Sequence, residues 1–340
     1  MLVFYIYLSL VVICSLIIKK KGFFLNFSGE IHQSFSNKGN VPLLGGIFIL
    51  APMSIIFLDN IILNLVLISI FLIGFFSDCK ILVSPKKRFI FQTIIIFFFV
   101  VVADLKIASS RIELFDIFLN NQIFSYFFST FCLLILTNGT NFIDGLNGIV
   151  ITNTIIILFI LNNLNLINGD IISDHTIFPI LLLLALILLL NFSNILMLGD
   201  SGAYLLGFFL GLIVIKSHIS YPHISPYFFI SLIWYPCFEN LFSIVRKLKK
   251  KSSPLKPDSK HFHQLVFFYI KRRYKMSLIF SNNLSSIIIC FFNFLIIYSS
   301  SLNPISTIYQ IQLIFASVVL YSTTYVFLNK FYKLNFQSEK

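Results

Sequence analysis

Amide and acidic side chains recur at short spacing in one segment, residues 137–148, which lies between two apolar runs. Its polar members stand every third residue and are Asn138, Asn141, Asp144 and Asn147. On an α-helix each step of three residues drifts by about 60°, so only neighbours would share a face. The glycines at 139, 145 and 148 favour a bent or broken segment that turns several of these groups toward one ligand. The alternative is a tight turn, in which Asn, Asp and Gly are common.

Two further acids stand beside apolar runs. Asp78 follows a run that ends at Phe76, and Asp200 precedes a run that begins at Tyr204. The alternative for Asp200 is a helix N-cap, since Asp is a favoured residue there and Gly199 suits the preceding turn. If these runs cross a membrane, acids beside them are costly and indicate function. Carboxylate, amide and phosphate oxygens together suit Mg²⁺, or Mn²⁺, rather than zinc.

Basic groups that could bind an anion gather near residue 260. His261 and His263 stand two residues apart, which is not the i, i+4 spacing of a helical zinc motif. They would share one side only in an extended segment, and the alternative is a pair of solvated loop histidines. Arg246 and Lys247 end an apolar run, where snorkelling of the side chains toward water is the simpler interpretation.

The elements that position these groups are predicted by composition. Hydrophobic residues make up 58% of the 340 residues and charged residues 11%, with mean hydropathy +0.93. A soluble domain carries about 25% charged residues. The chain is therefore predicted to be a polytopic membrane protein, which excludes cytosolic enzymes, disordered proteins, coiled coils and disulfide scaffolds. Its five cysteines form no CxxC or Cys/His pair, so neither a zinc site nor a disulfide framework is expected.

A transmembrane helix needs roughly 20 apolar residues, and we expect an all-α bundle of about eleven spans in one integral membrane domain over residues 1–340. The expected apolar cores are Leu2–Ile18, Leu43–Leu58, Ile61–Phe76, Phe89–Ala103, Ile123–Leu136, Ile149–Leu161, Ile177–Leu190, Tyr204–Ile215, Tyr227–Val245, Met276–Tyr298 and Ile308–Leu328. The first core is interpreted as a retained span and not a signal peptide. A surface-lying segment is expected around Arg111, Glu113 and Asp116.

Lysine and arginine orient this bundle. With the N-terminus outside and the C-terminus in the cytoplasm, nearly all basic residues fall in cytoplasmic segments, as the positive-inside rule requires. The polar groups described above lie in the same segments, which are predicted to form the active site: 19–42, 77–88, 137–148, 192–203 and 246–275. Because the net charge of +12 is divided among these loops, no nucleic-acid partner is expected.

With these residues in place, the chain resembles the polyprenyl-phosphate N-acetylhexosamine-1-phosphate transferases, a membrane family also described as glycosyltransferase family 4. The resemblance runs from about Lys38 to Gln264. The matching pieces, in order, are Pro42–Gly46, Asp78 with Ser84-Pro85, Asn138–Gly148, Gly199–Gly202, Arg246-Lys247, and Pro257-Asp258 followed by His261-Phe262-His263. The last piece looks like the GlcNAc-type branch and its O-antigen relatives.

The resemblance implies that undecaprenyl phosphate, or another polyprenyl phosphate, attacks a UDP-N-acetylhexosamine, with release of UMP. This step would start a lipid-linked glycan such as O-antigen or teichoic acid, at the cytoplasmic face of the bacterial inner membrane and in contact with its lipids. Oligomeric state, including a homodimer, is left open.

The resemblance also implies a role for each matched residue. Asp200 would hold Mg²⁺ with help from Asn141, and Asn138 and Asn147 would shape the nucleotide pocket. Phosphates would be held by Arg246, Lys247, His261 and His263. Asp78 would lie beside the attacking lipid phosphate, Asp144 would belong to the catalytic group, and Lys38 would contact substrate.

The chain departs from the family pattern at three positions. Ser77 stands where relatives usually carry an aspartate, Glu239 where aspartate is common, and Gln264 where another histidine is frequent. The alternatives are therefore a catalytically weakened member or a non-enzymatic membrane protein such as a transporter. The residues do not reveal the sugar or the pathway.

Overall fold

The computed structural model describes residues 2–25, 41–167, 174–251, 253 and 260–337. Regular structure in these residues is helical, apart from isolated β-bridges that pair Leu25 with Pro42 and Leu43 with Met197. The predicted all-α class is confirmed. All five cysteines are free, in line with the expected absence of a disulfide framework.

The helices follow the expected apolar cores along the chain. They are α1 (Leu2–Lys21), α2 (Gly45–Ile56), α3 (Ile61–Asp78), α4 (Pro85–Val102), α5 (Glu113–Leu119), α6 (Gln122–Ile143), α7 (Ile149–Asn163), α8 (Asp174–Phe192), α9 (Gly199–Ser220), α10 (Pro226–Leu232), α11 (Trp234–Lys249), α12 (Phe262–Tyr274), α13 (Leu278–Ser301) and α14 (Thr307–Gln337). Side-chain caps mark several of their starts: Asn60 accepts the Leu63 amide at α3, and Ser84 accepts the Lys87 amide at α4.

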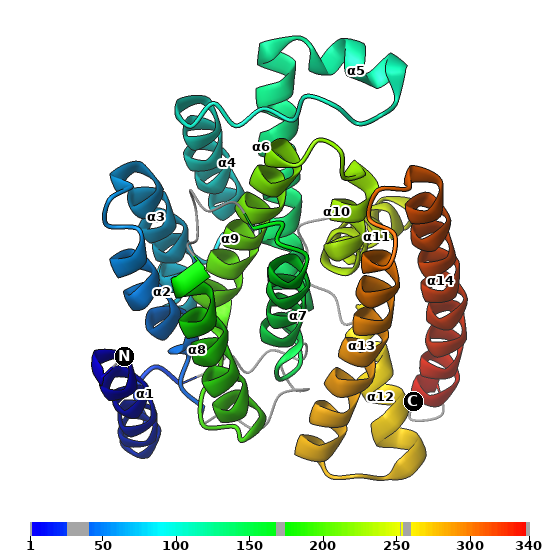
Figure 1. Cartoon of the computed structure of the whole chain (residues 1–340). Helices are drawn as coiled ribbons and strands as arrows, with labels where there is room; N and C mark the ends of the chain where they lie inside the picture. Colours follow the sequence, from blue (N-terminus) through cyan, green and yellow to red (C-terminus); the bar gives the residue numbers. More distant parts are fainter. Residues whose placement is uncertain (1, 26–40, 168–173, 252, 254–259, 338–340) are drawn as a thin grey trace.

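The centre of the molecule is α9, which is buried on nearly all sides and packs mainly against α6 and α3 (Figure 1). Small residues allow this packing. A Cβ atom on Gly46 of α2 would lie 2.6 Å from the Gly202 nitrogen, and one on Gly74 of α3 would lie 2.4 Å from the Ser201 Cα. The backbones of α2 and α3 therefore approach the first turn of α9 directly, as small residues permit between membrane helices.

Within the described residues, five helices are long and apolar enough to cross a membrane: α3, α6, α9, α13 and α14. A sixth span results if α10 and α11 are counted together. These helices identify an integral membrane protein, whereas the count of about eleven spans stays a prediction. The expected continuous core Tyr227–Val245 is wrong, because the chain bends by 78° between α10 and α11. Pro236 lies in the first turn of α11 and has no amide hydrogen with which to continue the preceding helix.

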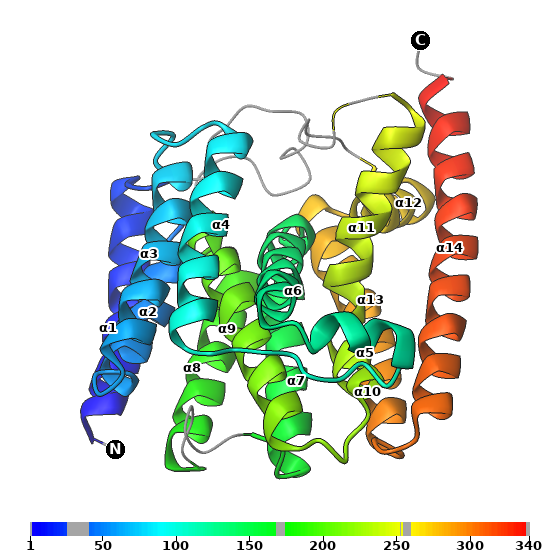
Figure 2. The same ribbon diagram turned by 90° about the horizontal axis from the view of Figure 1, so that it is seen from above.

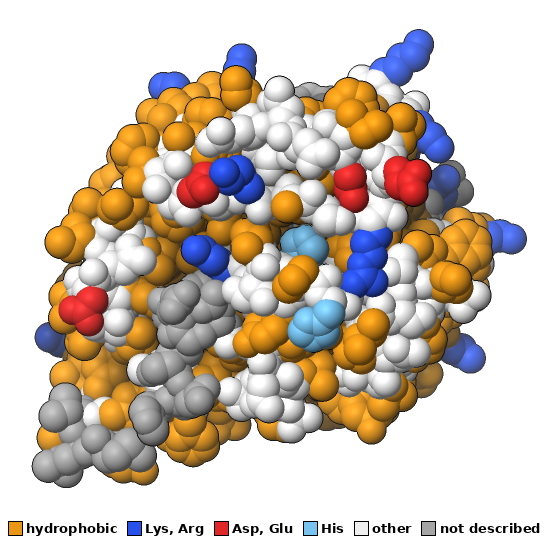
Figure 3. Space-filling view, turned by 45° about the horizontal axis from the view of Figure 1, so that its top comes forward, with side chains coloured by type: hydrophobic (Ala, Val, Ile, Leu, Met, Phe, Trp, Pro, Cys, Tyr) orange, Lys and Arg blue, Asp and Glu red, His pale blue; other side chains and the backbone are white. Residues whose placement is uncertain are grey.

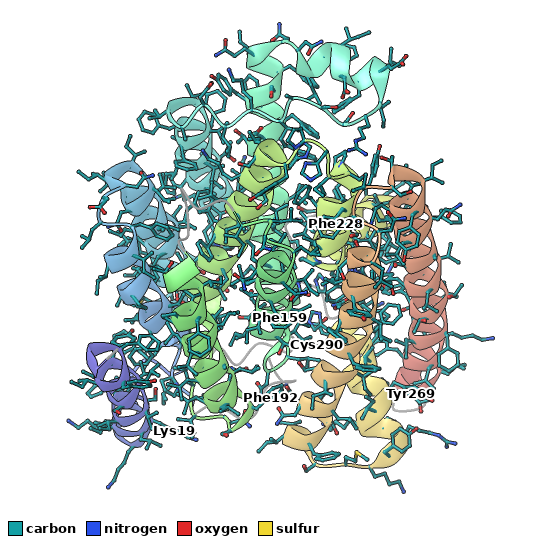
Figure 4. The ribbon with its side chains drawn as sticks, viewed as in Figure 1. Lys19, Phe159, Phe192, Phe228, Tyr269 and Cys290 are labelled. Carbon is teal, nitrogen blue, oxygen red and sulfur yellow. The ribbon has the colours of Figure 1, made fainter. Side chains whose placement is uncertain are left out.

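Two helices mark opposite edges of the bundle, α1 on one side and α14 on the other (Figure 2). The Lys19 ammonium group of α1 donates a hydrogen bond to the carbonyl oxygen of Asn194 at 2.6 Å (Lys19 is labelled in Figure 4). This contact ties the edge helix to the segment that leads into α9.

The expected surface-lying segment forms the short helix α5, which lies across one end of the bundle. The Arg111 guanidinium group donates to the carbonyl oxygens of His223 and Ile305, and so joins two other connections to this end. When this end comes forward, charged and histidine side chains are seen among polar and hydrophobic ones, with hydrophobic side chains around the rim (Figure 3).

Candidate active site

The carboxylate of Asp200 stands at the start of the buried helix α9 and joins three other helices. Its Oδ1 accepts a hydrogen bond from Asn141 Nδ2 of α6 at 2.8 Å. Its Oδ2 accepts from Ser77 Oγ of α3 at 2.7 Å and from Arg88 Nη1 of α4 at 2.6 Å. The side chain of Asp200 is 32% exposed, so the group is held on several sides and still reachable.

Asp78 caps α9. Its two carboxylate oxygens accept the backbone amides of Asp200 (2.9 Å) and Ser201 (3.1 Å), which have no partners within the helix. The alternative that Asp200 is the N-cap is therefore wrong, since Asp200 lies inside the first turn and Leu198 precedes the helix. Gly199 is required beside the cap because its φ is +74° and a Cβ there would lie 2.7 Å from Asp78 Oδ2.

The amide-rich segment is more helical than expected. α6 continues through Asn138 and Asn141 to Ile143, so Gly139 does not bend the chain, and the predicted break in the segment lies at residues 144–148. Gly139 serves packing instead, because a Cβ there would lie 2.4 Å from the carbonyl oxygen of Pro236 in α11. The chain leaves the helix only at Asp144, in the turn that precedes α7.

Asn138 and Asn147 direct their amides at protein partners. Asn138 Nδ2 donates to Gln92 Oε1 at 3.0 Å and thereby links α6 to α4. Asn147 Nδ2 donates to Asn194 Oδ1 at 3.1 Å and to Asn283 Oδ1 at 3.0 Å. A nucleotide could bind these two amides only by replacing such contacts.

The turn after α6 brings an acid next to a histidine. A Cβ on Gly145 would lie only 2.1 Å from His263 Nε2, so the imidazole rests on the glycine that follows Asp144. His263 is 1% exposed, and neither ring nitrogen has a hydrogen-bond partner among the described residues. A buried donor or acceptor without a partner is costly, which indicates a place where a ligand would supply one.

Electrostatics differ sharply between these two neighbours. Burial, with the negative charges of Asp200 and Asp78, holds the pKa of the Asp144 carboxyl well above its usual value. Burial lowers the pKa of the His263 imidazole to about 3, with a further contribution from the charge of His261, so His263 is neutral at pH 7. Three acids within mutual electrostatic reach leave a negative potential that suits a cation.

His261 is oriented by a buried carboxylate. Its Nδ1 lies 2.9 Å from Glu239 Oε1, and Glu239 also accepts from the Tyr321 hydroxyl of α14. The Gln264 side chain accepts the His261 amide at 3.1 Å. His261 is 7% exposed, so the alternative of two solvated loop histidines is wrong. Because His261 is extended and precedes α12, its ring stacks on that of His263 with centroids 5.7 Å apart.

The basic pair at the end of α11 is packed into the protein. Arg246 Nη1 donates to the carbonyl oxygen of Lys260 and to the Tyr325 hydroxyl (2.8 Å), which fixes the chain just before His261. Lys247 is 5% exposed, with its Nζ 6.0 Å from the centre of the Phe142 ring. Snorkelling into water therefore does not describe Lys247. Lys38 lies outside the described residues.

A metal site here would depend on few protein ligands. Among the described residues no group of three or more His, Cys, Asp or Glu side chains could hold one ion. The hard oxygens of Asp200 and Asn141 fit Mg²⁺ if phosphate oxygens complete its shell, and the like charge that raises the pKa of Asp144 favours a cation. In this structure the Arg88 guanidinium neutralises Asp200.

Sequence reasoning missed two residues that the structure places in the site. Arg88 was counted only as a cytoplasmic charge, although the Ser84-Pro85 helix start puts it in the first turn of α4. Tyr321 gave no signal, because it lies 82 residues after its partner Glu239.

Comparison with known proteins gives a consistent result. Residues 60–218 match the model of glycosyl transferase family 4. The chain is 24% identical over 242 residues to an undecaprenyl-phosphate alpha-N-acetylglucosaminyl 1-phosphate transferase of Salmonella typhimurium, covering 68% of this chain and 66% of that protein. It is 26% identical over 226 residues to a phospho-N-acetylmuramoyl-pentapeptide-transferase of Prochlorococcus marinus, covering 59% of this chain and 63% of that protein. The chain thus spans just under two thirds of the length of these relatives.

Proposed function

We propose that this chain, whose residues 60–218 match the model of glycosyl transferase family 4, transfers a sugar 1-phosphate from a nucleotide sugar to a polyprenyl phosphate. The donor would be a UDP-N-acetylhexosamine and the acceptor undecaprenyl phosphate. The products would be UMP and a polyprenyl-diphospho-sugar, formed at the cytoplasmic face of the bacterial inner membrane at the start of a lipid-linked glycan. The names of the relatives support this reaction.

One structural observation carries the proposal. The turn at Asp144 and Gly145 joins two polar groups that differ in chemistry: the carboxylate of Asp200, braced by Asn141, and the unpartnered imidazole of His263. Phosphoryl transfer needs little covalent help from a protein and depends on positioning and charge neutralisation. A carboxylate that could hold a cation on one side of this turn and a buried N–H donor on the other would offer both.

The proposed reaction needs no strong base. The attacking oxygen belongs to a phosphate whose second pKa is about 6, so it is mostly ionised at neutral pH. It forms a bond to the β-phosphorus of the donor, and the bond from that phosphorus to the UMP oxygen breaks. Ser77 in place of a carboxylate therefore does not preclude the step.

The protein groups would act by binding and orientation. Neutral His263 has one N–H with which to donate to a phosphate oxygen. Lys247, which follows Arg246 in the sequence, supplies a buried positive charge. Glu239 holds Nδ1 of His261 and so leaves Nε2 for a ligand. A Mg²⁺ held by Asp200 and Asn141 would neutralise the diphosphate when bound.

The test is a panel of UDP-sugars with purified protein and undecaprenyl phosphate in detergent. UMP release and the mass of the lipid product are measured with and without Mg²⁺. We expect one or a few UDP-N-acetylhexosamines to give a diphospho-sugar lipid. No product from any sugar, with folded protein and both substrates present, would contradict the proposal and favour a non-enzymatic role.

A further inference from the structure

Arg88 has hydrogen-bonding capacity that the protein does not use. Its Nη1 donates to Ser77 Oγ and to Asp200 Oδ2, both at 2.6 Å. Its Nε is buried and has no acceptor among the described residues, although the Arg88 side chain as a whole is 17% exposed. A guanidinium offers five N–H donors in a planar fork that matches phosphate. The unused edge indicates a missing acceptor.

Local electrostatics also favour an anion at this point. Arg88 lies in the first turn of α4, whose start is fixed by the Ser84 cap and Pro85. A cation in a first turn faces the positive end of the helix dipole, so its placement is unfavourable until an anion joins it. Asp200 is one such partner. Ser77 adds a neutral hydroxyl, which leaves Arg88 with a single carboxylate contact among the described residues.

The surroundings of this pair are apolar and exposed. Phe76 precedes Ser77 and is 40% exposed, and Phe89 follows Arg88 and is 46% exposed. Both helices carry further exposed apolar side chains, as expected of a surface that faces lipid. An anion bound to Arg88 thus has hydrocarbon-compatible surface next to it. The groups expected to hold the donor, His263 and Lys247, come from α12 and α11 instead.

We propose that Arg88 and Ser77 bind the phosphate head group of the lipid acceptor. The ligand class is a phosphate monoester on a long apolar chain, with Arg88 Nε as a donor to its oxygens. The Ser77 hydroxyl, whose one proton is donated to Asp200 in this structure, would become a second donor by turning from Asp200 to the phosphate. This inference rests on the proposed transferase function and deepens it, because it separates the acceptor subsite on α3 and α4 from the donor subsite.

The decisive experiment measures KM separately for undecaprenyl phosphate and for the UDP-sugar. For Arg88→Gln we expect the acceptor KM to rise about tenfold or more, as loss of a charge-assisted contact implies, with the donor KM within about twofold. Arg88→Lys retains charge but loses the fork and is expected to fall between. Lys87→Gln removes a charge from the same helical turn at an exposed position and serves as the matched control.

Ser77→Asp provides a second variant, in which the Arg88 side chain itself is unchanged. An added carboxylate would compete with the lipid phosphate for the guanidinium, so we expect a rise in acceptor KM of about tenfold, against about twofold for Ser77→Ala. Thermal unfolding confirms that each variant is folded. A raised donor KM with an unchanged acceptor KM in either Arg88→Gln or Ser77→Asp would overturn the assignment.

Binding without turnover separates this inference from the transferase proposal. Wild-type protein in nanodiscs is titrated with undecaprenyl phosphate, with undecaprenol and with inorganic phosphate. We expect the lipid phosphate to bind more tightly than the other two and Arg88→Gln to remove the difference. If that pattern holds but no sugar is transferred, the transferase proposal fails and the phosphate site stands. Equal binding of undecaprenol, or a site that prefers inorganic phosphate, would overturn the site even in an active enzyme.

Discussion

The two halves of the candidate site are built in different ways. In the carboxylate half, on α3, α4, α6 and α9, every oxygen of Asp200 has a hydrogen-bond donor. In the histidine half, on α11, α12 and α14, Glu239 orients His261, yet His263 is buried without a partner. The Asp200 carboxylate is thus satisfied by protein donors, with the Arg88 Nε left for a ligand, whereas both ring nitrogens of His263 lack a partner among the described residues.

Substitution in the carboxylate half should have the largest effect. We expect Asp200→Asn to lower kcat about a thousandfold, because the neutral amide cannot balance a cation or the Arg88 charge. The matched control is Asp59→Asn, which removes a carboxylate from an exposed position between α2 and α3. Measured UMP release near the wild-type rate would remove Asp200 from the reaction.

In the histidine half, the orienting carboxylate comes next. Glu239→Gln should lower kcat/KM by about tenfold to a hundredfold, since the amide presents a mixture of donor and acceptor to His261. Tyr321→Phe should cause a smaller loss, and Tyr298→Phe, at an exposed position of α13, none. Normal activity in Glu239→Gln would show that the fixed orientation of His261 is dispensable.

Gly145→Ala tests the contact at which the two halves meet. A methyl group 2.1 Å from His263 Nε2 must push the ring away. We expect the donor KM to rise about tenfold and the protein to lose about 1–3 kcal/mol of stability from overpacking. An unchanged donor KM, with the stability loss present, would place the phosphates of the donor elsewhere.

Acid should destabilise the histidine half. The pKa of His263 is about 3 in the folded protein and about 6.5 when free. The unfolded chain therefore binds one more proton between these values, and stability falls as the pH drops from about 6.5 toward 3. Thermal unfolding of wild-type and His263→Gln across this window should show a weaker pH dependence in the variant. Parallel curves would contradict a buried neutral imidazole.

The smallest expected effect is a change in stability caused by Asp144. Its pH dependence is opposite to that expected for His263. Burial and the charges of Asp200 and Asp78 raise the pKa of this carboxyl, so its ionised form lowers stability as the pH rises above 3.8. Asp144→Asn should raise the unfolding midpoint at pH 7 by about 2–4 °C while activity falls. A lower midpoint would mean that the ionised acid is already compensated.

Sequence patterns located much of this site. Asp200 and Asn141, which the resemblance implied as joint ligands of one metal ion, lie in hydrogen-bond contact at 2.8 Å, and their role in metal binding stays a prediction. The helical class followed from composition. The sequence could not show that Gly139 lies inside a helix, because a glycine can serve either a turn or a close contact between helices. Here it allows close contact with Pro236 of α11, which is distant in the sequence. The contact of Tyr321 with Glu239 depends on how distant helices pack, which local patterns do not encode.

The cap on α9 has a practical consequence. The Asp78 carboxylate accepts hydrogen bonds from the backbone amides of Asp200 and Ser201, and these amides are present whatever side chains the two positions carry. The two hydrogen bonds of the cap can therefore remain in a variant at position 200, although the contacts of the Asp200 carboxylate with α3, α4 and α6 are lost. Loss of turnover in a variant at position 200 that still caps and unfolds as the wild type does would report on the reaction, whereas the same loss at position 78 would also report on loss of the α9 cap.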